Sequence, residues 1–155
     1  MSEQSSPGGP IFFAGDDRLE GILEWPDSGP VAGGVVVAHP YPPHGATMAQ
    51  PVVHRIARAC RQRGLAALRF NFRSVGGSLG FFSGTEEHRD VLAAAAFLRA
   101  RLSEARGENE RAGNEPRLDG SPPGAESHVL DSPSLALAGY SFGSIMSARA
   151  AAEAG

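Results

Sequence analysis

The feature that most constrains the fold is the run GGVVVAH at positions 33–39, where small and apolar residues continue without a polar interruption. A strand with one wet face alternates polar and apolar residues, whereas a strand covered on both faces reads as a continuous apolar run. Similar apolar stretches occur at 65–72 and 135–138. These patterns predict a mostly parallel sheet with helices on both faces, which is the α/β class.

Segments in which apolar residues recur at helical spacing lie between these apolar stretches and after the last of them. The spacing, with capping and stop signals, predicts helices over 47–63, 85–102 and 142–154. Two shorter strands, 11–14 and 19–25, precede them, and the turn Gly15-Asp16-Asp17 between these strands predicts a hairpin. The expected order is therefore strand, strand, strand, helix, strand, helix, strand, helix.

Two segments lack this patterning. Residues 1–10 are rich in Ser, Pro and Gly, and residues 103–133 are rich in Gly, Pro, Asn, Glu and Arg with few large apolar side chains. Such composition cannot bury enough apolar surface to offset the entropy of ordering. We expect a disordered N-terminus at 1–10 and one domain over 11–155, with 103–133 as a disordered insertion.

Charge and cysteine content exclude several classes of protein. The net charge is -3 and all 14 basic residues are Arg, so we predict neither nucleic-acid nor membrane-surface binding. The absence of Lys excludes a Lys Schiff base and a P-loop lysine in these residues. The single Cys60 and the absence of a signal-peptide pattern favour a reduced, cytoplasmic setting. We predict no metal site and no membrane span.

The pattern G-x-S-x-G occurs twice, around Ser141 and around Ser78. It indicates a nucleophile only at a sharp turn from a strand to a helix. Ser141 follows an apolar strand and precedes a helix, whereas Ser78 leads into a glycine-rich loop. We therefore predict that Ser141 is the nucleophile, with Gly139 and Gly143 as the small residues that let the backbones pass closely.

The chemistry of such a serine needs donors for a developing oxyanion. The amide N–H of Phe142 lies at the predicted N-terminus of the last helix, where it could serve as one donor. The second donor is expected from the loop after the third strand. Three residues of that loop are prolines without an N–H, so Tyr41 is the first available donor after His39.

Three motifs in order resemble a known family. H-P-Y-P-x-x-G-A-T-M, R-F-N-F-R-S-V-G-G-S-x-G and L-A-G-Y-S-F-G-S are similar to motifs of compact bacterial α/β hydrolases, a group related to dienelactone-hydrolase-like and serine-aminopeptidase-like enzymes. In that group a His often stands at the position of Tyr41, and a Gly at that of Ser74. The resemblance implies the eight-stranded α/β-hydrolase fold, a small-molecule ester or related acyl substrate, and no cofactor.

One departure from the family is large. In this superfamily an acid and then a histidine follow the nucleophile, but after Ser141 the chain has one acid, Glu153, and no histidine. We expect Glu153 to be a solvated charge, His39 to anchor its loop, and His44 to be the first alternative base within these residues. We therefore expect an incomplete domain whose C-terminal strands and helices are absent.

This incompleteness has two expected consequences. The fragment should be inactive because the usual base is missing. The stretch 135–138 should form an apolar sheet edge, which favours aggregation or oligomer formation. The alternative functions are a non-catalytic domain of the same fold that binds a ligand or partner and, with weaker support, a nucleotide-binding α/β domain. The latter lacks both G-x-G-x-x-G after a strand and G-K-[ST].

Overall fold

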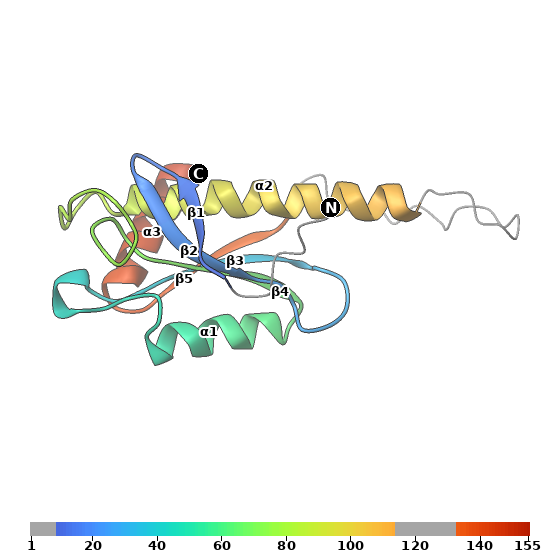
Figure 1. Cartoon of the computed structure of the whole chain (residues 1–155), viewed down its shortest axis with the longest axis horizontal. Coiled ribbons are helices and arrows are strands. Elements are labelled where there is room, and N and C mark those ends of the chain that lie inside the picture. The colour runs from blue at the N-terminus through green and yellow to red at the C-terminus, as the bar shows by residue number, and fades with distance from the viewer. Residues whose placement is uncertain (1–8, 114–132) are drawn as a thin grey trace, which may run out of the picture.

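A five-stranded sheet forms the centre of the protein. The structure is a computed structural model that describes residues 9–113 and 133–155. The strand order is β1-β2-β4-β3-β5 (Figure 1). The bounds are Ile11–Ala14 for β1, Arg18–Glu24 for β2, Gly33–Ala38 for β3, Leu65–Phe70 for β4 and Leu135–Gly139 for β5.

The sheet is mixed, and its parallel part carries the functional end. The hairpin of β1 and β2 pairs antiparallel, and β2 pairs antiparallel with β4. Strand β3 pairs parallel with both β4 and β5. The predicted hairpin and the α/β class are confirmed. The carboxyl ends of β3, β4 and β5 therefore meet at one edge of the sheet, which is where α/β proteins place their ligands.

Helices cover both faces of the sheet, as the continuous apolar run of β3 predicts. Helix α1 (Pro51–Arg61) lies on one face, and α2 (His88–Gly113) and α3 (Phe142–Ala154) lie on the other (Figure 1). Every residue of β3 is buried. Val35 and Val37 pack in the cluster on the α1 side, while Val36 and Ala38 belong to the larger core on the opposite side.

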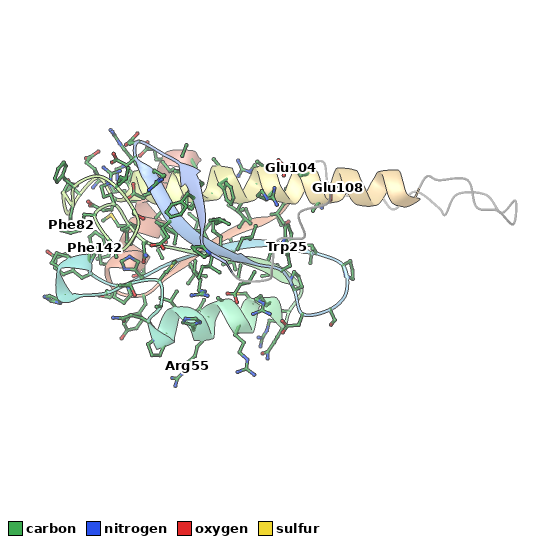
Figure 2. The ribbon with its side chains drawn as sticks, in the orientation of Figure 1. Trp25, Arg55, Phe82, Glu104, Glu108 and Phe142 are labelled. Atoms are coloured by element: carbon green, nitrogen blue, oxygen red, sulfur yellow. The ribbon has the colours of Figure 1, made fainter. Side chains whose placement is uncertain are left out.

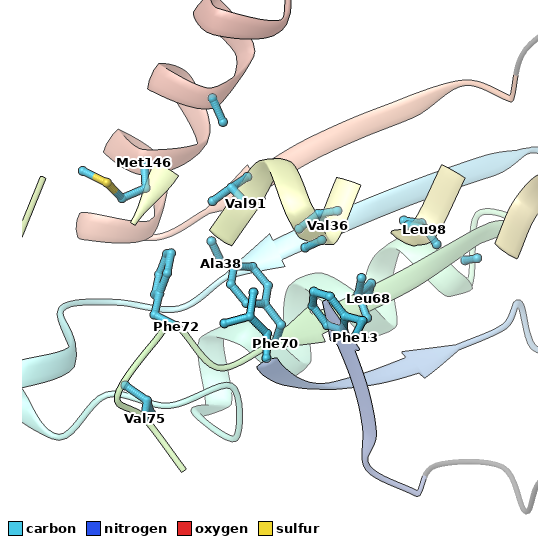
Figure 3. Packing of buried hydrophobic residues seen from close by; sticks show 14 of the residues in the cluster. Phe13, Val36, Ala38, Leu68, Phe70, Phe72, Val75, Val91, Leu98 and Met146 are labelled. Carbon is cyan, nitrogen blue, oxygen red and sulfur yellow. The ribbon is translucent and has the colours of Figure 1, made fainter. Parts of the chain in front are cut away.

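The larger core lies between the sheet and the two helices α2 and α3. Phe13, Leu68 and Phe70 from the sheet pack beneath Leu98 of α2, and Met146 of α3 closes one end of the cluster (Figure 3). Each large apolar side chain that is fully buried contributes roughly 1.5–3 kcal/mol to the burial free energy. The elements that carry the candidate site are therefore fixed by the main core.

Strand β5 is an edge of the sheet within the described residues, as the sequence predicts for 135–138. A groove of about 660 Å³ runs beside it, between α2 and α3. Leu135 and Leu137 of β5, Leu92 of α2 and Ala148 of α3 are among its lining residues. This edge presents unpaired backbone groups next to apolar surface, the arrangement that favours association with another strand.

Both boundaries of α1 and both boundaries of α2 differ from the sequence prediction. Helix α2 continues to Gly113 rather than ending at residue 102, so the prediction of a disordered segment is wrong for 103–113. Glu, Arg and Ala in this stretch are strong helix formers, and Arg101 and Glu104 form an ion pair one turn apart. Helix α1 begins at Pro51 rather than at 47, because proline is favoured at the first helical position.

Other predictions fall outside what the structure describes. Residues 1–8 and 114–132 are not described, so the predictions of disorder there remain predictions. Within the described residues, no helix combines the length and the apolar character required to cross a membrane.

Candidate functional site

The turn from β5 to α3 holds Ser141 in an unusual backbone conformation. Its φ is 54° and its ψ is -121°, and among the described non-glycine residues only Ser74 also has a positive φ. Such a conformation costs on the order of 1–3 kcal/mol and persists only where the surroundings enforce it. The Ser141 side chain is exposed, and its hydroxyl makes no hydrogen bond within the described part of the chain.

The two glycines of the motif provide that enforcement. A Cβ atom on Gly139 would lie 2.4 Å from the carbonyl carbon of Gly143, and one on Gly143 would lie 2.4 Å from the carbonyl oxygen of Ala38. The strand, the turn and the first turn of α3 thus pack backbone against backbone. We call residues 139–143 the elbow. The predicted strand-to-helix context of Ser141 is present, and both glycines are sterically required.

Ser78, in the second G-x-S-x-G match, has a different environment. It is buried, its hydroxyl donates a hydrogen bond to the Asn71 carbonyl oxygen at 2.7 Å, and it accepts one from the Glu20 amide at 2.9 Å. A hydroxyl committed to these partners and covered by protein cannot reach a substrate. The structure therefore agrees with the prediction that this serine belongs to a glycine-rich loop.

Tyr41 and Phe142 come together at the carboxyl edge of the sheet, although they are far apart in sequence. Tyr41 leads a short 3-10 helix, η1 (Pro42–His44). Its ring centroid lies 5.5 Å from that of Phe142. Phe142 is the first residue of α3, where an amide N–H has no intrahelical acceptor. The Tyr41 N–H makes no hydrogen bond within the described residues either.

His39 holds the start of this loop. It is fully buried, its Nδ1 lies 2.7 Å from the Pro40 carbonyl oxygen, and its Nε2 lies 3.1 Å from the Phe72 amide. The amide can only donate, so Nε2 accepts and Nδ1 carries the proton. Burial lowers the pKa of His39 to about 4, although the bond to Pro40 opposes that change. Both ring nitrogens are engaged, so His39 serves as an anchor rather than as a base.

We expect acid to weaken the folded state through His39. The unfolded imidazole takes up its proton near pH 6.5, whereas the folded one does so near pH 4. Between these values the unfolded state binds more protons, so stability is complete above pH 6.5 and is lost as the pH falls toward 4. The loss between about pH 7.5 and about pH 5 should be about 2 kcal/mol.

Urea unfolding of the wild-type chain and of His39→Gln at both pH values measures this contribution. The variant should be less stable at the higher pH and should lose the His39 part of the pH dependence. An unchanged pH dependence in His39→Gln would show that this imidazole titrates alike in both states.

The other described histidines have separate environments. His54 on α1 contacts Arg69, with 3.2 Å between Nε2 and Nη1. His88 is buried at the start of α2, with Nδ1 3.1 Å from the Thr85 carbonyl oxygen and Nε2 2.9 Å from a carboxylate oxygen of Glu153. Glu153 is exposed, as predicted for a solvated charge, and the packing of α3 against α2 also brings its carboxylate into contact with His88.

His44 is the described histidine whose ring contacts Tyr41, the residue that packs on Phe142 of the elbow. It is exposed on η1, and its ring centroid lies 5.0 Å from that of Tyr41. His128 lies outside the described residues. Within the described part of the chain, no group of three His, Cys, Asp or Glu side chains could hold a metal ion.

A buried ion pair fixes the loop that faces the elbow, residues 73–87. Arg73 donates through its amide, Nε and Nη2 to the carboxylate of Asp90, at 2.6–3.1 Å. The hydrogen bond to Asp90 raises the pKa of the Arg73 guanidinium, so it stays charged. Glu87, also fully buried, accepts from the amide and hydroxyl of Ser83. The start of the loop is therefore tied to the first turn of α2 through Asp90, and Glu87 holds the end of the loop just before that helix.

Sequence reasoning missed these anchoring residues. Acidic residues near the start of a helix are ordinarily explained by the helix dipole, so the sequence alone assigns Glu87 and Asp90 no further role. The signal that could have found them is the Arg after an apolar strand, followed within one loop by two acids at a helix start. That pattern is suggestive, but only the fold shows that the three side chains share one buried site.

Comparison with protein families and with curated proteins gives one partial match. No family model matches the chain. A stretch of 90 residues is 38% identical to the uncharacterized protein RP471 of Rickettsia prowazekii, covering 57% of this chain and 37% of that protein.

Solved structures give a fuller match. An α/β serine hydrolase homologue from Coxiella burnetii matches 97% of this chain with a TM-score of 0.74 and 26% identity. XC6422 from Xanthomonas campestris, a member of the α/β serine hydrolases without a lid, matches 99% with a TM-score of 0.72 and 29% identity. The chain spans 60% and 59% of these two structures. It is similar to α/β serine hydrolases along nearly all of its length, and its fold is of the α/β-hydrolase type.

Proposed function

We propose that this α/β-hydrolase-like chain carries the nucleophile of a serine hydrolase that acts on an ester or related acyl substrate. The observation that carries the proposal is Ser141, held at φ 54° with an unbonded, exposed hydroxyl between two sterically required glycines. A strained serine on a turn between a strand and a helix is the arrangement of the nucleophile elbow. Strain at such a position favours a functional role over a structural one.

The reaction would proceed through an acyl-enzyme. The Ser141 oxygen attacks the acyl carbon and gives up its proton to a base, and the resulting oxyanion accepts hydrogen bonds from the amides of Phe142 and Tyr41. The leaving group departs with a proton, and water then releases the acyl group from Ser141. Contact between the Tyr41 and Phe142 rings supports this assignment, because both residues lie at the same edge of the sheet.

Three of the described histidines are committed to contacts away from the Ser141 hydroxyl. His39 and His88 use both ring nitrogens in other bonds, and His54 contacts Arg69. We propose that the complete protein takes its base from residues outside this sequence, with His44 as the alternative within it.

Covalent labelling tests the nucleophile. A fluorophosphonate probe should label the complete protein at Ser141, identified by mass spectrometry of the modified peptide. Ser141→Ala should abolish labelling because the attacking oxygen is gone, whereas Ser78→Ala should retain it in whatever fraction remains folded, as measured by circular dichroism. Labelling that survives Ser141→Ala would contradict the assignment. A folded wild-type protein that is never labelled would favour the non-catalytic binding domain instead.

A further inference from the structure

Three aromatic rings from three separate segments meet beside the elbow. Tyr41 precedes η1, Phe82 lies in loop 73–87 and Phe142 begins α3. The ring centroids are 5.5 Å apart for Tyr41 and Phe82, 5.5 Å for Tyr41 and Phe142, and 5.7 Å for Phe82 and Phe142. Phe82 and Phe142 lie next to one another at the carboxyl edge of the sheet (Figure 2). We call these three residues the ring cluster.

The loop that supplies Phe82 also exposes two large apolar side chains. Phe81 is 91% exposed and Leu79 is 53% exposed. Single exposed apolar residues are ordinary on flexible loops, but this loop is tied down by the Arg73–Asp90 pair and by the bonds of Glu87 to Ser83. An anchored loop that holds a phenyl ring in solvent next to the partly buried ring cluster presents apolar surface to a binding partner or ligand.

The charges around the elbow restrict what that surface can bind. Among the described residues of loop 73–87, the first turn of α2 and all of α3, the arginines are Arg73, Arg89 and Arg149. Each is already engaged, with Asp90, with Glu86 and Asp16, and with the Thr85 carbonyl oxygen respectively. No arginine in these segments is left to receive the carboxylate or phosphate of an anionic substrate, which such groups ordinarily require.

We propose that the surface formed by Phe81 and the ring cluster binds an uncharged apolar group of the substrate, either an alkyl chain or an aryl ring, in front of Ser141. The inference rests on the proposed function, because it assigns the substrate class of that same site. It makes Phe81 the main specificity residue. It also predicts discrimination between a neutral ester and the matching carboxylate, which differ in charge but share the apolar group.

Binding measured without turnover tests this. We take Ser141→Ala as the background, since it cannot hydrolyse an ester, and titrate it with methyl 4-phenylbutyrate and with 4-phenylbutyrate by saturation-transfer NMR. The neutral ester should bind at least about tenfold more tightly than the anion, the ratio that corresponds to about 1.4 kcal/mol. Adding Phe81→Ser should weaken ester binding about fivefold, as expected for the loss of roughly 40 Å² of apolar contact.

Phe81→Leu is the matched control. It keeps a large apolar side chain at the same exposed position, so it should retain most of the ester binding that Phe81→Ser loses. Equal weakening by both substitutions, equal binding of ester and anion, or undiminished binding in the Phe81→Ser variant would each overturn the proposal. The proposal would also be overturned if phosphatidylcholine vesicles bound the protein in a manner that depends on Phe81 while the ester did not bind.

The experiment also separates the two proposals. Ester binding that depends on Phe81 in a protein whose Ser141 resists fluorophosphonate would leave the apolar site in place and contradict the hydrolase. Labelling of Ser141 without such binding would keep the hydrolase and overturn the assigned substrate class.

Discussion

Gly143→Ala should destabilise the folded chain by about 3 kcal/mol or more, at the upper end of what overpacking costs. The added methyl would lie 2.4 Å from the Ala38 carbonyl oxygen and 2.6 Å from that of His39. Both contacts are with backbone at the end of β3, which is central to the sheet and cannot yield as a flexible side chain can. The elbow would have to move away from β3, taking Ser141 with it.

Gly107→Ala provides the matched control for this substitution. A Cβ atom on Gly107, in the middle of α2, would meet nothing within 4 Å. Replacing glycine by alanine inside a helix stabilises it by roughly 1 kcal/mol, so the same chemical change should have opposite signs at the two positions. Urea unfolding followed by circular dichroism measures both. A loss below about 1 kcal/mol in Gly143→Ala would show that the elbow is not packed as tightly as described.

Much of the fold can be predicted from the sequence because its signals are local. The strands around Val36 and Leu68 are buried on both faces, and a continuous apolar run is what that environment selects. The elbow is predictable for a similar reason. Gly139 and Gly143 are sterically required within five consecutive residues, so the local motif carries most of the geometry that the fold realises.

Long-range pairings could not be predicted in the same way. His88 and Glu153 lie at the start of α2 and near the end of α3, and their contact depends on how these helices cross. The pairing of Arg73 with Asp90 likewise depends on the path of a loop. Helix α2 extends past 102 because helix-forming residues continue beyond its apolar stripe, whereas our prediction ended with the stripe.

The candidate site combines parts that the sequence predicts with parts that depend on long-range packing. Tyr41 was predicted as a donor from the prolines around it, and the fold places its ring against Phe142. Phe82 carried no such signal, since a phenylalanine in a glycine-rich loop has no periodicity to interpret. Its position follows only from the anchors at both ends of loop 73–87, which are themselves tertiary. The substrate-facing side of the site is therefore the part that required the structure.

Tyr41→Pro should lower kcat/KM of the complete enzyme by about 10²–10³ relative to Tyr41→Ala, the usual effect of losing one oxyanion donor. Proline removes the N–H, and the φ of Tyr41, -61°, is already the value that a proline ring imposes. The Tyr41 amide makes no other hydrogen bond within the described residues, so its removal leaves no native bond broken. Both variants lose the ring that packs on Phe142.

The comparison of these two variants therefore isolates the amide hydrogen. Tyr41→Ala measures the loss of the ring alone, and Tyr41→Pro measures the loss of the ring together with the donor. A donor that acts only on the oxyanion changes kcat and leaves KM nearly unaltered, because the charge it stabilises is absent from the bound ester. Hydrolysis of a neutral aryl ester, with unfolding curves to confirm that both variants are equally stable, gives the measurement. Equal kcat values for the two variants would place the second oxyanion donor elsewhere than Tyr41, while leaving the assignment of Ser141 to its own labelling experiment.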